Sequence, residues 1–270
     1  MNKFDGILFC TDLDGTLLKN DKTISKENLD AIEYFKSEGG YFTFITGRLP
    51  YFSEKFYQII HPNAPIGCIN GGGVYDYETK KYLHAITLPP SVIELVEYVD
   101  RAIPNIGIQL NTLERIYFSN HNQANVDFCR WTDVEDLNLD YHKVTEPIAK
   151  IVFADNDINN IHRLAELLDS HPRAAEFDFV HSERTLYEIL PKGVHKGAAL
   201  APIAQSLGVD RSRTVVVGDY NNDIGMVKEA ALGYAVANAT DEVKAVADRI
   251  TVSNEEHAIA RIIQELERDA

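Results

Sequence analysis

The feature that most constrains this chain is a short apolar segment that ends in two carboxylates. Residues 6–11 have the composition of a strand buried on both faces, and Asp12 and Asp14 follow it directly. Carboxylates at the carboxyl end of a buried parallel strand occupy the place where open α/β sheets bind their ligands. An Asx-turn or a helix cap would explain a single Asp-x-Asp-Gly equally well, so the rest of the chain decides between the two interpretations.

The next segments predict alternating helices and strands. Residues 25–38 place apolar side chains three apart on one helical face, and residues 41–45 and 65–69 have the composition of two further buried strands. Alternation of this kind predicts a parallel sheet with right-handed crossovers. The third strand is followed by Gly71-Gly72-Gly73, a run flexible enough for a hairpin or a hinge.

Residues 84–190 follow a different pattern. Pro89-Pro90 interrupts the chain, and five short strand-like segments are mixed irregularly with helices. This order predicts an α+β domain of residues 84–190, inserted into a core formed by residues 1–83 and 191–270. The histidines of the insertion share no metal-ligand spacing, and surface positions or hydrogen-bonded roles are the commoner explanation for them.

Polar groups follow two other predicted strands and precede one helix. Thr46-Gly47-Arg48 ends the second strand and offers a phosphate a hydroxyl and backbone N–H groups. Lys196 lies just before a predicted helix, at an end where the dipole disfavours a cation, which indicates that it serves an anion. The buried strand 214–217 leads into residues 218–223 (Gly-Asp-Tyr-Asn-Asn-Asp), which hold more carboxylates and amides than a turn requires. Taken alone, the first motif is more often a turn and the lysine more often a solvated surface residue.

The formal net charge of −15 argues against two classes of partner. Nucleic acids and anionic membranes both need a basic face, so we expect neither. Cys10, Cys68 and Cys129 are odd in number and far apart, which predicts no disulfide and no zinc framework. The amino terminus leads straight into a strand without a signal peptide or a spanning segment, so a reducing cytoplasm is the expected location.

Because parallel strands end at one edge of their sheet, these polar groups are expected to converge. Unit charges 4 Å apart repel by roughly 4 kcal/mol at an effective dielectric constant of about 20. Converging carboxylates would therefore need a hard cation, and few oxygen ligands with room for water favour Mg²⁺. Together with the cation, Lys196 and Thr46 would form a receptacle for a phosphoryl group. The carboxylates are those of Asp12, Asp14, Asp219 and Asp223.

Four segments, in this order and spacing, resemble the motifs of the haloacid dehalogenase superfamily. They are DLDGTLL at residues 12–18, TGR at 46–48, KG at 196–197 and GDYNND at 218–223. The insertion and the run EILPKGVHKG at residues 188–197 resemble the Cof-like branch of that superfamily, which has a C2-type cap. The resemblance spans nearly the whole chain. It implies an α/β fold with a Rossmann-like parallel sheet as the core and an inserted α+β cap domain.

The resemblance also implies a role for each motif residue. Asp12 would be the nucleophile that forms an aspartyl-phosphate, and Asp14 would act as acid and then as base. The implied phosphate ligands are Thr46, Gly47, Lys196 and Asn222, and the implied Mg²⁺ ligands are Asp12, Asp14, Asp219 and Asp223. We expect selection among substrates to rest on Arg48 and on the cap residues that precede a returning strand, His181, Ser182, Glu183 and Arg184.

We therefore predict a Mg²⁺-dependent phosphatase that hydrolyses a small phosphorylated metabolite, with sugar phosphates as the leading substrate class. A phosphosugar mutase or a disaccharide-phosphate phosphatase is the alternative among enzymes, and an isomerised product in place of inorganic phosphate would identify the mutase. A protein that binds a phosphorylated ligand for regulation, without turnover, is a further alternative. Mg²⁺-dependent hydrolysis within a panel of phosphate esters would exclude it.

Overall fold

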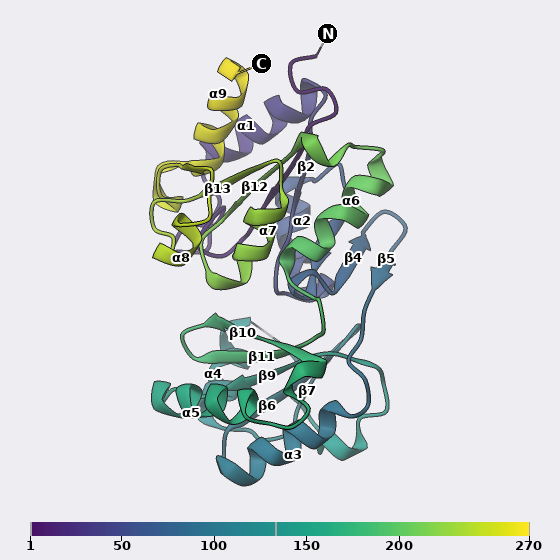
Figure 1. Cartoon of the computed structure of the whole chain (residues 1–270). Helices are drawn as coiled ribbons and strands as arrows, with labels where there is room; N and C mark the ends of the chain where they lie inside the picture. Colours follow the sequence, from purple (N-terminus) through teal and green to yellow (C-terminus); the bar gives the residue numbers. More distant parts are fainter. Residues whose placement is uncertain (1, 133, 270) are drawn as a thin grey trace. The chain divides into compact units, whose positions relative to one another are not determined.

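The computed structural model describes residues 2–132 and 134–269, and it divides the chain into two compact units. Unit 1 comprises Met1–Ala85 and His195–Ala270, and unit 2 comprises Ile86–Val194. Figure 1 shows the elements of both units, coloured along the sequence. In the described part of the chain, no helix combines the length and the apolar character that crossing a membrane requires.

Unit 1 is built around a sheet of five parallel strands. In spatial order they are β14 (Arg249–Ile250), β13 (Leu232–Ala235), β12 (Thr214–Gly218), β1 (Leu8–Thr11) and β2 (Tyr41–Phe44). Every residue of β1 is buried, as expected for a strand covered on both faces. The chain passes from β1 to β2 on one side and later returns to β12 on the other. Open α/β sheets bind ligands at such a reversal of strand order, outside the carboxyl ends of the strands.

Helices cover both faces of this sheet, as Figure 1 shows. α1 (Lys26–Ser37) and α9 (Ala258–Asp269) pack against each other, whereas α7 (Ile224–Glu229) packs on β12 and β13. In Figure 1, α6 (Leu200–Leu207) and α7 lie in front of the sheet and α2 (Pro50–Ile60) lies behind it. The short helix α8 (Asp241–Lys244) connects β13 to β14. The parallel α/β core predicted from the sequence is confirmed.

The third predicted strand does not continue the parallel sheet. β3 (Ile66–Cys68) touches that sheet through a parallel bridge between Ile45 and Gly67. It pairs antiparallel with β4 (Gly73–Asp76), and β5 (Lys81–Ala85) completes this second sheet. A tight turn over Ile69–Gly71, which has positive φ at all three residues, reverses the chain between β3 and β4.

The glycines of this turn do not form a hinge between the units. At Gly71 an added Cβ would lie 2.0 Å from the carbonyl oxygen of His195, so glycine is required there. Residues 71–73 are buried inside unit 1, whereas the chain passes into unit 2 only after Ala85. Of the two interpretations of the glycine run, the hinge is wrong and the reversal of the chain is observed.

Unit 2 contains a mostly antiparallel sheet of six strands. In spatial order they are β10 (Phe177–Glu183), β11 (Leu186–Pro191), β9 (Ile148–Ala154), β6 (Gly107–Thr112), β7 (Ile116–Phe118) and β8 (Leu137–Asn138). Apolar side chains of α3 (Val92–Ala102) and α5 (Ile158–Asp169) form one core with β6, β9 and β11. α4 (Gln123–Thr132) follows β7 and contacts β6. The inserted α+β domain expected from the sequence is confirmed.

Candidate active site

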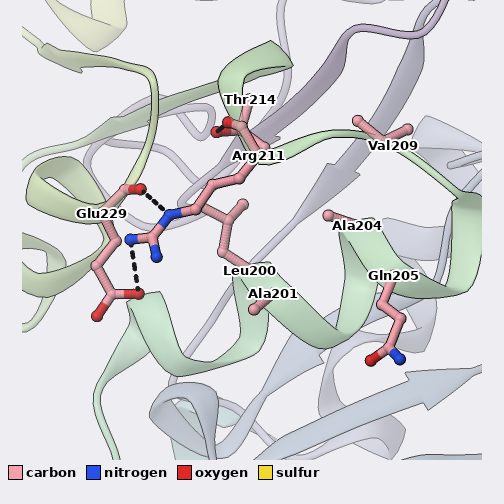
Figure 2. Close-up of a pocket in the computed structure, with 8 residues that line it drawn as sticks. All are labelled: Leu200, Ala201, Ala204, Gln205, Val209, Arg211, Thr214 and Glu229. Carbon is pink, nitrogen blue, oxygen red and sulfur yellow. Dashed lines mark hydrogen bonds and ion pairs between the residues drawn. The ribbon is translucent and has the colours of Figure 1, made fainter.

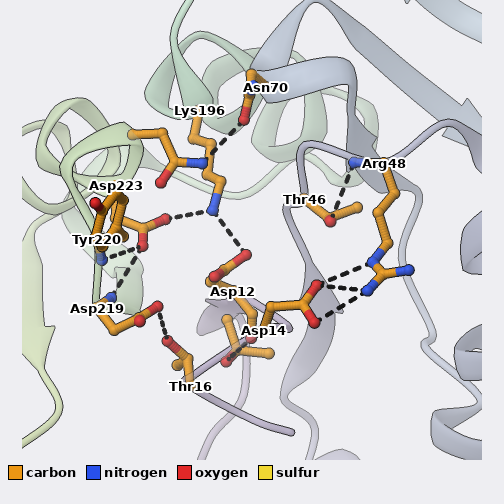
Figure 3. A network of polar contacts seen from close by, with 12 residues as sticks. Asp12, Asp14, Thr16, Thr46, Arg48, Asn70, Lys196, Asp219, Tyr220 and Asp223 are labelled. Atoms are coloured by element: carbon orange, nitrogen blue, oxygen red, sulfur yellow. Dashed lines mark hydrogen bonds and ion pairs between the residues drawn. The ribbon is translucent and has the colours of Figure 1, made fainter. Parts of the chain in front are cut away.

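The carboxyl ends of β1 and β12 bring two aspartates together. Asp12 follows β1 and its backbone N–H donates to the Val217 carbonyl of β12 at 3.0 Å, while Asp219 follows β12 itself. Gly15 has a φ of +77°, and a Cβ there would lie 2.3 Å from a carboxylate oxygen of Asp219. Glycine is therefore required for the close approach of the two loops. Figure 3 shows the polar network that results.

A third carboxylate, that of Asp223, joins Asp12 and Asp219. Each of the three offers an oxygen, and these oxygens lie within 4.8 Å of one another. Burial raises the pKa of Asp12 well above its ordinary value, despite the opposing attraction of Lys196. Burial and the charge of Asp223 also raise the pKa of Asp219 to about 7. Burial is the larger cause of both shifts, and repulsion from the neighbouring carboxylates adds to it.

The cation beside these carboxylates is the ammonium of Lys196. It lies 2.7 Å from a carboxylate oxygen of Asp12 and 2.7 Å from one of Asp223, and its side chain is 1% exposed. Burial alone would lower the pKa of Lys196, but the two carboxylates outweigh it and the pKa is raised. One ammonium against three carboxylates leaves the cluster negative.

Asp223 mainly holds its neighbours in place. One of its oxygens accepts from Lys196, and the other accepts from the backbone N–H groups of Asp219 at 2.9 Å and Tyr220 at 3.0 Å. Thr16 has a similar effect on Asp219, since its hydroxyl donates to that carboxylate at 3.0 Å. These contacts orient Asp12 and Asp219, whose other oxygens face the cluster.

The donor set fits a hard divalent cation. Carboxylate oxygens are the ligands that Mg²⁺ prefers, and three of them lie close enough together to contact one ion. The charge of that ion would neutralise the excess negative charge of the three carboxylates. In this arrangement Asp12 and Asp219 would hold the ion, with Asp223 beside them.

Asp14 is not brought into this group of carboxylates. Its carboxylate pairs with the Arg48 guanidinium through two hydrogen bonds of 2.9 and 3.0 Å, and with the Lys22 ammonium at 2.8 Å. Burial alone would raise the pKa of Asp14, but Arg48 and Lys22 lower it below its usual value. The physical reason is that a bidentate ion pair is more favourable than a fourth carboxylate beside three others. The structure therefore does not place the Asp14 side chain as the metal ligand that the sequence predicted.

The predicted phosphate ligands lie around the same strand ends. Thr46 is buried after β2, and its hydroxyl accepts the backbone N–H of Arg48 at 3.3 Å. The side-chain amide of Asn222 donates to Asn70 at 3.1 Å, and a Cβ at Gly47 would lie 2.9 Å from the same Asn70 oxygen. Asn70 thus links the loops after β2 and β12.

A cavity of about 170 Å³ elsewhere in unit 1 is a poorer candidate (Figure 2). It lies beside α6 and Thr214, which begins β12, whereas Asp219 follows the opposite end of that strand. Within it, Arg211 donates to the Glu229 carbonyl at 2.9 Å and pairs with its carboxylate at 3.7 Å. Ligand pockets usually exceed about 300 Å³. This cavity is smaller, and its charged groups already pair with each other.

A family model of haloacid dehalogenase-like hydrolases matches residues 9–263, which is most of the chain. The chain belongs to the haloacid dehalogenase-like hydrolase family. The resemblance inferred from the four sequence motifs is therefore confirmed. All four motifs lie in unit 1, around the active site described above.

Several relatives of this hydrolase are named as phosphatases. The 5-amino-6-(5-phospho-D-ribitylamino)uracil phosphatase YitU of Bacillus subtilis (strain 168) is 29% identical over 96% of each chain. The pyridoxal phosphate phosphatase YbhA of Escherichia coli (strain K12) is 26% identical over 93% of this chain and 95% of its own. A haloacid dehalogenase-like hydrolase structure from B. subtilis superposes with a TM-score of 0.85 at 21% identity, over 96% of this chain and 99% of its own, which shows a shared fold.

Sequence reasoning missed three residues of this network. Thr16, Lys22 and Asn70 contact Asp219, Asp14 and Asn222 respectively. Thr16 lies inside the first motif, but its partner Asp219 is 203 residues away in the sequence. The other two carry no local signal, because their partners lie far away in the sequence or across a loop.

The predicted cap residues lie in the hairpin of β10 and β11. His181, Ser182 and Glu183 end β10, and Arg184 belongs to the turn. A ring nitrogen of His181 lies 3.3 Å from the Arg184 carbonyl oxygen. The hairpin belongs to unit 2, and its role in substrate selection stays a prediction.

Proposed function

We propose that this phosphatase hydrolyses small phosphorylated metabolites, sugar phosphates in particular, with Mg²⁺ and through a phosphorylated Asp12. The observation that carries the proposal is the buried Lys196 ammonium, 2.7 Å from Asp12, in a pocket that still has excess negative charge. A divalent cation together with this lysine makes the pocket complementary to a phosphoryl group. Phosphate monoesters are among the slowest esters to hydrolyse without a catalyst, so concentrated positive charge is what their transition state needs.

In the first step, a carboxylate oxygen of Asp12 bonds to phosphorus while the bond from phosphorus to the leaving oxygen breaks. Lys196, which already contacts the other oxygen of Asp12, stabilises the charge on the phosphoryl oxygens. Asp14 gives its proton to the leaving oxygen. In the second step, water attacks phosphorus and Asp14 takes the water proton. The Asp12–phosphorus bond breaks, inorganic phosphate leaves and both carboxyl groups are restored.

The ion pair between Asp14 and Arg48 adds a condition to this scheme. Paired as it is in the structure, Asp14 is ionised and cannot serve as an acid. The scheme therefore requires Arg48 to leave Asp14 when substrate binds. A released guanidinium is a bidentate partner for a phosphate ester or its hydroxyl groups, which agrees with the predicted part of Arg48 in substrate selection.

Bound Mg²⁺ would neutralise phosphoryl charge and lower the repulsion that Asp12 meets on approaching an anionic ester. Asp12 and Asp219 are its proposed ligands, with Asp223 close by.

The names of two relatives support a small phosphate ester as substrate. YitU is named for a substrate with a phosphorylated ribityl group and YbhA for pyridoxal phosphate. YitU is the more similar of these two relatives, so its name favours a phosphorylated sugar or sugar alcohol as the substrate here. Two different esters on one scaffold also imply that the groups around the leaving alcohol, and not the pocket for phosphate, decide the substrate.

A panel of phosphate esters tests the proposed function. The panel holds sugar phosphates, sugar alcohol phosphates, pyridoxal phosphate and an aryl phosphate, each assayed with Mg²⁺ and with EDTA. We expect inorganic phosphate to be released with Mg²⁺ and the sugar and sugar alcohol esters to have the highest kcat/KM. Absence of Mg²⁺-dependent phosphate release from every ester would contradict the proposal.

Replacing Asp14 with asparagine is expected to slow the first step selectively. Alkyl esters need their leaving oxygen protonated, so the burst of released alcohol should slow by about 10²- to 10⁴-fold. An activated aryl phosphate needs little protonation, so its burst should survive while the loss of the base leaves the phosphorylated enzyme to accumulate. Rapid-quench measurement of both bursts is the test, and equal losses on the two esters would exclude this role of Asp14.

Replacing Asp219 with asparagine is expected to make the protein at least as stable as the wild type in EDTA but less stable than the wild type in Mg²⁺. In EDTA the variant should melt at or above the wild-type temperature, because one of three mutually repelling carboxylates is gone while Thr16 can still donate to the amide oxygen. Mg²⁺ at 100 times its Kd should add about 2.7 kcal/mol to the wild type and little to the variant. Asp169→Asn, an exposed change of the same charge in unit 2, is the control. If Mg²⁺ stabilises Asp219→Asn as much as it stabilises Asp169→Asn, Asp219 is not a ligand of the metal.

Replacing His181 and Arg184 together with alanine is expected to change the ranking of substrates. The groups of unit 1 act on the phosphoryl group that all esters share, so selection among esters has to come from other residues. The inserted unit 2 is the candidate for that role. We expect kcat/KM for sugar phosphates to converge toward one value while the aryl phosphate is hydrolysed as before. Arg101→Ala, on the exposed side of α3, is the control. An unchanged ranking would exclude the hairpin as the selector.

A further inference from the structure

Unit 2 contains a second group of metal-binding side chains, which the phosphatase scheme does not use. His121, Cys129 and Asp136 each offer one ligand atom, and the three atoms lie within 4.8 Å of one another. They come from different places in the fold: the loop after β7, helix α4 and the segment before β8. Cys129 follows His121 by eight residues and Asp136 follows Cys129 by seven, a spacing that matches no familiar zinc motif.

The three side chains are held in different ways. A ring nitrogen of His121 lies 2.7 Å from a carboxylate oxygen of Asp136, and the ring packs at 5.5 Å from that of the fully buried Phe118. Cys129 is partly buried on α4, while the Asp136 side chain is 51% exposed. The histidine and the cysteine are thus fixed by packing, and the aspartate is free enough to adjust to an ion.

We propose that His121, Cys129 and Asp136 bind a borderline-soft divalent cation of the Zn²⁺ class. One nitrogen, one sulfur and one carboxylate oxygen form a donor set that Zn²⁺ accepts, whereas Mg²⁺ prefers oxygen ligands. Three protein ligands leave a fourth tetrahedral position for water. The site lies entirely within unit 2 and does not depend on the proposed phosphatase scheme.

The surroundings of His121 give an ion a way in. His121 borders a cavity of about 490 Å³ that is also lined by the polar side chains of Asp100, Asn105 and Asn120. Polar linings of this kind hold water, so a hydrated cation can reach His121 from this side.

A bound ion would fasten one edge of the unit 2 sheet. The edge strand β8 has two residues and pairs in parallel with β7, which is a weak attachment by itself. The ion would connect the chain just after β7 and the chain just before β8 to α4. We therefore expect metal to slow hydrogen exchange in residues 134–138.

Cobalt titration in excess Mg²⁺ tests this proposal on the whole chain. Mg²⁺ in excess occupies carboxylate sites but does not compete for a thiolate, so the absorption of a cobalt–thiolate bond reports on the mixed site alone. We expect one Co²⁺ per chain, with the near-ultraviolet charge-transfer band of a cobalt–thiolate bond, and loss of the band when Zn²⁺ is added. Absence of this band in the wild type would overturn the proposal.

Two variants and one control make the assignment specific. Cys129→Ser should remove the band. His121→Gln should weaken Co²⁺ binding by about 100-fold or more, which is a larger loss of affinity than removal of a residue that only hydrogen-bonds to a metal ligand causes. His142→Gln is the matched control, because His142 lies in the same unit between Glu97 and Asp140 and has no thiol beside it. Melting in EDTA checks that each variant folds. A band that persists in Cys129→Ser, or unchanged affinity in His121→Gln, would show that the ion binds elsewhere.

Discussion

Replacing Asp12 with asparagine is expected to abolish turnover while the protein stays folded. Removal of the covalent nucleophile lowers kcat by about 10⁶-fold in a serine protease, and we expect a loss on the order of 10⁵- to 10⁶-fold here. The amide oxygen can still accept the hydrogen bond from Lys196, and the change removes one of three crowded carboxylates, so the melting temperature in EDTA should not fall. Steady-state phosphate release measures the first effect and thermal melting the second.

The covalent intermediate separates a chemical role of Asp12 from a purely electrostatic one. After an acid quench, phosphate label from the substrate should remain on the wild-type chain and be absent from the variant. Asp30→Asn, an exposed change of the same kind on α1, should keep both the label and the rate. A variant at position 12 that keeps a tenth of the wild-type rate would rule out Asp12 as the nucleophile.

Replacing Lys196 with methionine is expected to cost both stability and activity. Removing one member of a buried ion pair typically costs about 3–5 kcal/mol, because its partners stay buried without compensation. Here the partners are Asp12 and Asp223, each 2.7 Å from the ammonium. Loss of a charge that stabilises the phosphoryl oxygens should also lower kcat by about 10³-fold. Denaturant unfolding and steady-state kinetics measure the two losses.

Mg²⁺ and a second lysine provide the controls. If three unbalanced carboxylates cause the instability, Mg²⁺ should restore part of the lost stability without restoring the rate. Lys22→Met removes an ammonium that pairs with Asp14 but is 59% exposed, so its unfolding free energy should change by less than about 1 kcal/mol. Equal destabilisation by the two changes would show that burial of Lys196 between the carboxylates is not the cause.

The sequence predicted those parts of the site that depend on neighbours in the chain. β1 is an apolar run that ends just before Asp12, and β12 is a β-branched run that ends just before Asp219. Both strands and both carboxylates could therefore be predicted from the local sequence. Their convergence followed from the rule that parallel strands end at one edge of the sheet. The order of the motifs then placed the chain in its family.

Tertiary structure decided what depends on contacts between distant segments. Asp14 pairs with Arg48, 34 residues away, because a bidentate ion pair is more favourable than a place among three like charges. β3 pairs antiparallel with β4 because the turn between them reverses the chain, which the apolar composition of β3 could not indicate.

By itself, then, the sequence determined the α/β class, the insertion and the carboxylates at the strand ends, because periodicity and strand-end composition are local properties. Only the tertiary structure decided which charges pair with Lys196 and Arg48, and that His121, Cys129 and Asp136 meet in unit 2. Hydrogen bonds and ion pairs act over a few ångströms in space, whatever the separation along the chain, so their partners are fixed by packing.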